Sequence, residues 1–131
     1  MESKTLERLR RVANTQTLQL THYGRKTGRP YEVIIWYMVD DDRLYLVTSN
    51  ATRNWVRNVK VRPATSVRIG DEVFSGNVRA ITDTQEREKV IGLVERKYWY
   101  VIPLLRLGRF LTSMGITSDN SAAFEVILAD D

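Results

Sequence analysis

The segment that most constrains the fold is the nearly unbroken apolar run Val33-Ile34-Ile35-Trp36-Tyr37-Met38-Val39. It is rich in β-branched and aromatic residues and too short for a stable helix, so it predicts a strand. Because apolar and polar residues do not alternate along it, we expect a central strand that is buried on both faces. Gly24, Gly28 and Pro30 predict a turn before this run, and Asp40-Asp41-Asp42 predicts a solvated hairpin turn after it.

The other elements follow from period-2 and helical patterns. Strands are expected at Thr15–Thr21, Arg43–Ser49, Ala64–Ile69, Glu72–Ile81 and Ala122–Leu128. Helices are expected at Ser3–Ala13, at Arg53–Lys60 after a Thr52 cap, and from Asp83, where Asp83 and Glu86 form a capping box. Gly70-Asp71 suits a two-residue hairpin turn, and Gly76 in mid-strand suggests a bulge or a bend. Short hairpins and few long crossovers favour an α+β fold with an antiparallel, barrel-like sheet.

Length and composition limit the classes of site. The chain has 131 residues, which suits a single domain over residues 1–131. It contains no cysteine and one histidine, His22, so thiolate chemistry is excluded and no metal site is expected. No signal-like segment or membrane-length apolar run is present, and we therefore expect a cytoplasmic protein. The net charge of +4 fits an anionic ligand, a phosphate-bearing cofactor or loose nucleic-acid contact.

The basic turn, residues Tyr23–Pro30, is the first candidate site. Arg25, Lys26 and Arg29 can pair with phosphate, and the glycines let backbone N–H groups approach an anion. The glycine spacing of a P-loop is missing. Spacing alone leaves open a plain hairpin turn that carries solvated charges.

A second candidate is the segment Arg53–Asn58, which offers an aromatic plane, two cations and two amides. A flat heterocycle could lie beside Trp55, while Asn58 or Arg57 meets its polar edge. The alternative is an amphipathic helix with Trp55 in the core.

No catalytic pair is visible. A lone histidine at a strand end, such as His22, is more often structural, and Asp40–Asp42 share one turn and cannot flank a substrate. The catalytic residues are therefore unknown from the sequence. If the chain is an enzyme, a bound cofactor is expected to supply the reactivity.

Two motifs at this separation carry a family resemblance. The sequences Leu20–Pro30 and Asn54–Val59, with the strand Asp42–Ser49 between them, resemble the deazaflavin-dependent nitroreductase family. That family belongs to the flavin/deazaflavin oxidoreductase superfamily of split β-barrels, and the similarity covers Leu18–Ile81. It implies an antiparallel, FMN-binding-like split barrel with a short N-terminal helix, one inserted short helix and a C-terminal helical pair.

The resemblance also implies a site. Members bind the deazaflavin coenzyme F420, with its phosphate-bearing tail at the basic turn, and pass a hydride to a quinone, an activated alkene or a nitro compound. Carried over, the phosphate end comprises Arg25, Lys26, Thr27 and Arg29, and the ring end comprises Ile35, Trp36, Thr48, Ser49, Asn50, Trp55 and Asn58. Tyr98 and Tyr100 are the candidates to face the substrate.

Other interpretations remain open at this level. The loop Asn50–Asn54 is shorter than is usual in the family, which leaves FMN as an alternative cofactor. A non-catalytic barrel that binds a cofactor or lipid is the second hypothesis, because Tyr98–Leu111 is unusually apolar and suits an acyl pocket, a homodimer interface or peripheral membrane contact. Nucleic-acid binding ranks last, because no such motif is present.

Overall fold

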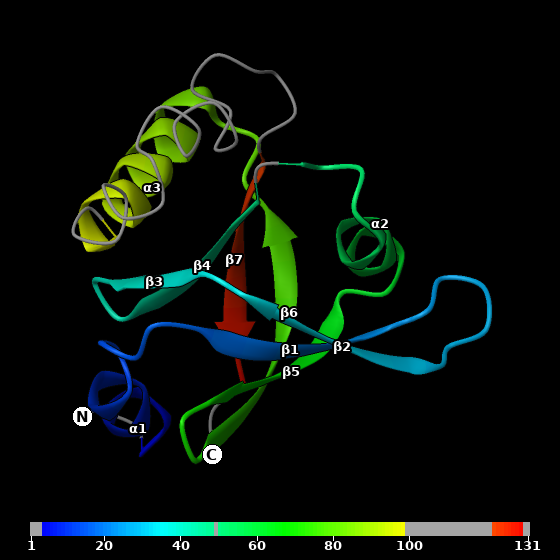
Figure 1. Ribbon diagram of the computed structural model, residues 1–131, viewed down its shortest axis with the longest axis horizontal. Helices are drawn as coiled ribbons and strands as arrows, with labels where there is room; N and C mark the ends of the chain where they lie inside the picture. Colours follow the sequence, from blue (N-terminus) through cyan, green and yellow to red (C-terminus); the bar gives the residue numbers. More distant parts are fainter. Residues whose placement is uncertain (1–3, 49, 99–121, 130–131) are drawn as a thin grey trace.

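Seven antiparallel strands form one strongly curled sheet in the computed structural model, which describes residues 4–48, 50–98 and 122–129 (Figure 1). The strand order is β2-β1-β5-β6-β7-β4-β3. The strands are β1 (Leu18–Tyr23), β2 (Pro30–Ile35), β3 (Tyr37–Asp40), β4 (Arg43–Thr48), β5 (Ala64–Ile69), β6 (Glu72–Ala80) and β7 (Ala122–Leu128). The helices are α1 (Lys4–Arg11), α2 (Asn54–Val61) and α3 (Thr84–Lys97). The expected α+β split barrel is confirmed, although the second member of the C-terminal helical pair falls in residues 99–121, outside the described ranges.

The expectation of one central strand at Val33–Val39 is wrong. The run is divided between β2 and β3, which lie at opposite edges of the sheet, and Trp36 joins them. Exposure differs accordingly, since Ile34 is 70% exposed and Tyr37 is fully buried. The sheet curls far enough to bring its two edges together, so a single residue suffices to cross between them (Figure 1). A local apolar pattern does not encode that curl.

Two strands in the interior of the sheet have the bounds that the sequence predicts. β5 has the predicted bounds, and β6 follows it through the predicted turn, in which Gly70 has φ +62°. β7 also has the predicted bounds and lies between β6 and β4, so the last described strand takes an interior position in the sheet.

Gly76 is required by close packing, and the expected bulge is absent. Pairing runs without interruption on both sides of this residue, with Thr65 opposite it on β5 and Leu128 opposite it on β7. A Cβ atom at position 76 would lie 2.7 Å from the carbonyl oxygen of Ile127 and 2.9 Å from Cγ1 of Val126. Only glycine fits this approach between strands.

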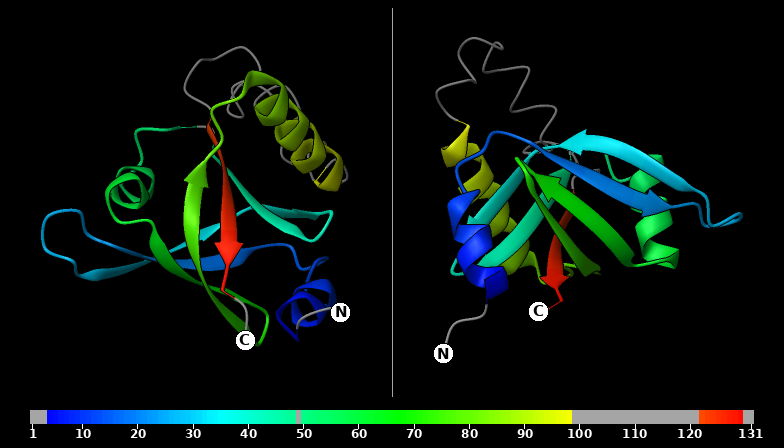
Figure 2. Two further views of the ribbon diagram at one scale, coloured as in Figure 1. Left: turned by 180° about the vertical axis from the view of Figure 1, so that it is seen from behind. Right: turned by 90° about the horizontal axis from the view of Figure 1, so that it is seen from below.

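Two hydrophobic cores lie on the two faces of β4. The main core contains Leu44 and Leu46 together with the buried faces of α1 and α2. The second core contains Tyr45 and Val47 and is covered by α3. Figure 2 shows α2 and α3 on opposite sides of the curled sheet. Alternate residues of one strand therefore serve two separate layers.

The helix α3 begins and packs as its sequence predicts. The carboxylate of Asp83 accepts a hydrogen bond of 2.8 Å from the backbone N–H of Glu86, which confirms the cap. Val90 and Val94 form its buried stripe, and each contributes about 1.5–3 kcal/mol through burial. None of the helices within the described ranges is long and apolar enough to cross a membrane.

The C-terminal end of α3 is anchored by Lys97. Its Nζ donates a 3.1 Å hydrogen bond to the carbonyl oxygen of Tyr37 and lies 3.5 Å from the centroid of the Tyr37 ring. Burial of the ammonium group lowers the pKa of Lys97 to about 8. Tyr98, the next residue, is fully buried, and its hydroxyl accepts a hydrogen bond from the backbone N–H of Tyr37.

The helix α2 begins one residue later than expected, and the Thr52 cap is wrong. Arg53 occupies the N-cap position without a side-chain bond to the helix. The backbone N–H and the hydroxyl of Thr52 both donate to Oδ1 of Asn50, at 2.9 and 2.5 Å. The side chain of Asn50 therefore holds Thr52 in a local turn, and Thr52 does not cap α2.

The hairpin between β3 and β4 carries the predicted solvated turn. Asp41 and Asp42 both have positive φ, at 53° and 61°, which is the geometry of a two-residue type I′ hairpin. The guanidinium of Arg10 forms two hydrogen bonds to the carboxylate of Asp42, at 2.9 and 2.6 Å, and holds the pKa of that carboxyl below its usual value. This pair ties α1 to the hairpin.

Candidate functional site

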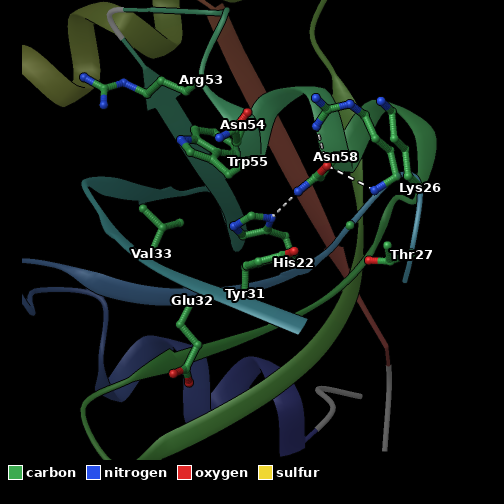
Figure 3. Close-up of a pocket in the computed structure, with 12 residues that line it drawn as sticks. His22, Lys26, Thr27, Tyr31, Glu32, Val33, Arg53, Asn54, Trp55 and Asn58 are labelled. Carbon is green, nitrogen blue, oxygen red and sulfur yellow. Dashed lines mark hydrogen bonds between the residues drawn. The ribbon is translucent and has the colours of Figure 1, made fainter. Parts of the chain in front are cut away.

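A cleft of about 630 Å³ lies between the basic turn and α2 (Figure 3). The basic turn contributes Gly24, Arg25, Lys26 and Thr27, the start of α2 contributes Arg53, Asn54, Trp55 and Asn58, and β1 and β2 contribute His22, Tyr31, Glu32 and Val33. The cleft thus joins the two motifs that the sequence singles out.

The basic turn is held by its own backbone. The N–H of Gly24 donates to the carbonyl oxygen of Arg29 at 2.8 Å, and the N–H of Gly28 donates to the carbonyl oxygen of Gly24 at 2.8 Å. Gly28 has φ +74°, a value that a residue with a side chain rarely adopts. The hydroxyl of Thr27 accepts from the N–H of Arg29 at 3.2 Å. The turn is therefore a preformed platform for its cations.

Asn58 connects α2 to this platform. Its side chain is 4% exposed, and its Oδ1 accepts two hydrogen bonds from Arg25, one from the backbone N–H at 3.1 Å and one from Nη1 at 2.8 Å. Its Nδ2 lies 3.0 Å from Nδ1 of His22. One buried amide thus fixes the turn, α2 and the end of β1 relative to one another.

His22 lines the cleft, although the sequence did not single it out as a candidate site residue. The residue is 5% exposed, and its ring stacks on Tyr31 with centroids 5.8 Å apart. Burial lowers its pKa from the ordinary value of 6.5. The signal was the alternation of β1, because Leu18, Leu20 and His22 all lie on its buried face.

The electrostatic character of the cleft is basic. Arg25 and Lys26 line one end and Arg53 lines another part of the wall, while the guanidinium carbon of Arg62 lies 3.7 Å from the place a Cβ of Gly28 would take. Across the described ranges, no ion pair joins these four cations to a carboxylate. Glu32 is the acidic residue among those lining the cleft, and its carboxylate points away from Asn58 and Lys26 (Figure 3). An anionic group is therefore attracted to the end of the cleft that the basic turn forms.

The apolar part of the cleft comes from Trp55 and Val33, which extend from α2 and β2. Trp55 is also a core residue, since it is 3% exposed and its ring meets Phe124 edge-on at 5.4 Å. The core interpretation of Trp55 is thus confirmed, and its contact with a flat heterocycle stays a prediction. A flat ligand with an anionic tail matches a cleft that is apolar in one part and cationic in another.

The predicted site residues separate into three groups. Those that line the cleft are Arg25, Lys26, Thr27, Trp55 and Asn58. Those that lie elsewhere are Arg29, which is exposed on the turn, Ile35, which packs against the main core, and Trp36, Thr48, Asn50 and Tyr98. Ser49 and Tyr100 lie outside the described residues.

Trp36 and Tyr98 form a stacked pair, with centroids 4.1 Å apart and planes inclined by 10°. They belong to the second core beneath α3, and the hydroxyl of Tyr98 donates to the carbonyl oxygen of Gln16. Thr48 and Asn50 are engaged with each other through hydrogen bonds of 3.1 and 3.2 Å. The structure thus places Tyr98 in the packing of α3 and away from the cleft.

Comparisons with known proteins give the family of the chain and relatives of its fold. A sequence profile described as F420H(2)-dependent quinone reductase matches residues 2–100. Among curated proteins none matches the chain.

Solved structures share the fold at low sequence identity. An F420-H2-dependent reductase, FDR-A, is 22% identical with a TM-score of 0.62, covering 84% of this chain and 92% of its own. A structure described as a domain-swapped dimer is 22% identical with a TM-score of 0.65, covering 94% of each chain. A FAD-binding protein from Mesorhizobium loti is 16% identical with a TM-score of 0.65, covering 96% of this chain and 90% of its own.

Proposed function

Because the chain belongs to the F420H2-dependent quinone reductase family, we propose that it passes a hydride from reduced F420 to a quinone, an enone or a nitro compound. The observation that carries this proposal is the cleft that joins a preformed cationic turn to an apolar wall at Trp55 and Val33. When bound, the reduced deazaflavin supplies the hydride. The residues of the chain bind and orient the cofactor and shape the space for the acceptor.

The phosphate end of the cofactor is assigned to the basic turn. Arg25 and Lys26 line the cleft, and Arg29 lies in the same turn. Arg25 is held at its backbone by Asn58, so part of the ordering cost is met before the ligand arrives. Each charge-assisted hydrogen bond to phosphate contributes about 1.5–3 kcal/mol.

The ring end is assigned to the start of α2 and the facing part of β2. Trp55, Asn54 and Val33 line this part of the cleft. Thr48 and Asn50 precede α2 and do not line the cleft, so their contact with the ring, like that of Ser49, stays a prediction. Ile35 packs against the main core and Trp36 packs against the second core. We propose that they hold β2 in place and do not contact the ring.

Cofactor binding is the experiment that tests the proposal. F420 and FMN are titrated in parallel into the purified protein, and binding is followed by tryptophan fluorescence. We expect F420 to bind at micromolar concentration and FMN to bind more weakly. Tighter binding of FMN would favour the alternative cofactor, and binding of neither would overturn the assignment as a reductase.

The acceptor class is tested separately. Reduced F420 is mixed with the protein and with a simple quinone, an enone or a nitroaromatic compound, and its oxidation is followed by absorbance. We expect the quinone to be reduced fastest, as the family description suggests. Binding of F420 without oxidation by any of the three would favour a carrier that holds the cofactor without catalysis.

We also propose a homodimer. Ile34 and Tyr31 are large apolar residues exposed on the edge strand β2, and Val61 is exposed at the end of α2. A structural relative with the same fold is described as a domain-swapped dimer. Sedimentation equilibrium tests the oligomeric state, and a mass of one chain at all concentrations would contradict it.

A further inference from the structure

We infer that Asn58 holds His22 as the neutral Nε2–H tautomer, and that His22 donates this hydrogen to a ligand bound in the cleft. The ligand atom is a carbonyl oxygen or a ring nitrogen, the acceptors that a flat heterocyclic cofactor presents. The identity of the ligand rests on the proposed function. The tautomer rests on the ligand-free geometry alone.

The orientation of the Asn58 amide is fixed by Arg25. A backbone N–H and a guanidinium can only donate, and both face one end of the amide, at 3.1 and 2.8 Å. That end must therefore be the oxygen, and the other end must be the NH2 group. The NH2 group lies 3.0 Å from Nδ1 of His22, so Nδ1 accepts and the ring hydrogen sits on Nε2.

The Nε2–H group opens into the cleft. His22 lines the cleft, and within the described ranges its hydrogen-bond partner is Asn58 at Nδ1. No buried side-chain nitrogen or oxygen atom in those ranges lacks a hydrogen-bond partner. Since Nε2 has no partner among the described residues, it is not a buried atom, and a ligand in the cleft can reach it. Figure 3 shows His22 among the lining residues, bonded on one side to Asn58, so a ligand that fills the cleft can meet this donor.

Protonation of His22 is opposed by Asn58 on α2 and by the cations of the basic turn. A hydrogen on Nδ1 would face the NH2 group of Asn58 on α2, and turning the amide would set that group against two donors of Arg25. Arg25 and Lys26 of the basic turn are cations, β2 presents the stacked ring of Tyr31, and the carboxylate of Glu32 points away from His22. Burial also disfavours the charged ring and lowers the pKa of His22. His22 therefore serves as a neutral donor at physiological pH.

The tautomer is measured first, on the ligand-free protein. His22 is the single histidine of the chain, so nitrogen NMR of the imidazole needs no assignment by mutation. We expect the Nε2–H tautomer and a titration midpoint below 6.5. In Asn58→Asp, a carboxylate oxygen replaces the NH2 group, so the midpoint should rise above that of the wild type. An Nδ1–H tautomer in the wild type would overturn the inference.

The ligand contact is measured with a matched pair of variants. His22→Gln places an amide near the position of Nε2 and keeps a donor there, whereas His22→Asn reaches only the position of Nδ1. We expect His22→Asn to weaken F420 binding about fivefold to tenfold and His22→Gln to weaken it less. The thermal midpoint of each variant reports whether the fold is retained.

The outcomes separate the inference from the proposed function. If F420 binds to the wild type and the Nε2 resonance does not move, or if His22→Asn binds normally, His22 is a structural acceptor and the inference fails. If the wild type binds no F420, the proposed function fails and the ligand contact fails with it. The tautomer is then still decided by the ligand-free spectrum.

Discussion

Asn58 donates a 3.0 Å hydrogen bond to Nδ1 of His22, and this contact joins the middle of α2 to the end of β1. Because the other end of the same amide is bonded to Arg25, one side chain fixes both the basic turn and His22. Asn58 is thus a positioning residue before it is a ligand contact.

Replacement of Asn58 tests this role. Asn58→Ala leaves Nδ1 of His22 and the N–H of Arg25 without their buried partner, and we expect the free energy of unfolding to fall by about 1–3 kcal/mol. Urea denaturation measures the loss. Lys60→Ala, on the exposed face of the same helix, is the matched control and should change stability by less than about 0.5 kcal/mol. Equal effects of the two substitutions would contradict the assignment.

Lys26 tests the phosphate end of the site without disturbing the amide network, because no hydrogen bond of the described structure depends on its side chain. Lys26→Ala should weaken F420 binding by about 1.5–3 kcal/mol and leave stability unchanged. The loss should shrink as salt is added. Arg57→Ala, an exposed cation of α2 that does not line the cleft, serves as the control. Unchanged affinity in Lys26→Ala would place the phosphate elsewhere.

Lys97 should leave a signature in the alkaline range. Its folded pKa is about 8, whereas an exposed lysine titrates near 10.5. Between these values the unfolded chain binds more protons, so the contribution of Lys97 to the free energy of unfolding should rise with pH from about 8 to 10.5. Lys97→Met should remove this rise. Denaturation curves across that range, recorded for both proteins, make the comparison, and identical slopes would show that Lys97 is not desolvated.

His22 should make the free energy of unfolding depend on pH in the acidic range. Its folded pKa lies below 6.5, so the unfolded chain protonates first as pH falls. The stabilisation is therefore fully present above about pH 6.5 and is lost as the pH falls toward the folded value. His22→Gln lacks this dependence and should give a flatter stability profile between pH 5 and 7, about the range in which an ordinary histidine titrates.

Two glycines form a matched pair for packing. Gly76→Ala introduces a Cβ 2.7 Å from a backbone oxygen and should destabilise the protein by about 1–3 kcal/mol. Gly92→Ala, within α3, meets nothing within 4 Å and should stabilise it by about 0.5–1 kcal/mol. Thermal unfolding measures both. The same sign for both substitutions would contradict the close strand approach at Gly76.

The sequence predicts those parts of the fold whose cause is local. The Asp83 cap, the Gly70 turn and the bounds of β5 and β7 all follow from neighbouring residues. The split of Val33–Val39 does not, because an edge strand of a curled sheet keeps the β-branched residues of a central one. No residue pattern within Val33–Val39 predicts that the two edges of the sheet meet.

The same division applies to the site. The basic turn and the start of α2 are recognisable as motifs, and the structure brings Arg25 and Trp55 to one cleft. The part played by His22 depends on its contact with Asn58, which is 36 residues away in sequence. Tyr98 misleads in the opposite way, because an aromatic residue suits a substrate pocket and a buried helix end equally well.

The one-residue passage at Trp36 has a mechanical consequence. β2 carries Val33 at the wall of the cleft, β3 carries Tyr37 beneath the end of α3, and Trp36 between them is stacked on Tyr98. With no slack in the chain at this point, a displacement of β2 by an incoming molecule cannot be absorbed by a loop. The first packing contact after Val33 and Ile35 along the chain is the Trp36–Tyr98 stack, so the wall of the cleft and the end of a helix on the other face of the sheet are joined by a short covalent path with no loop in it.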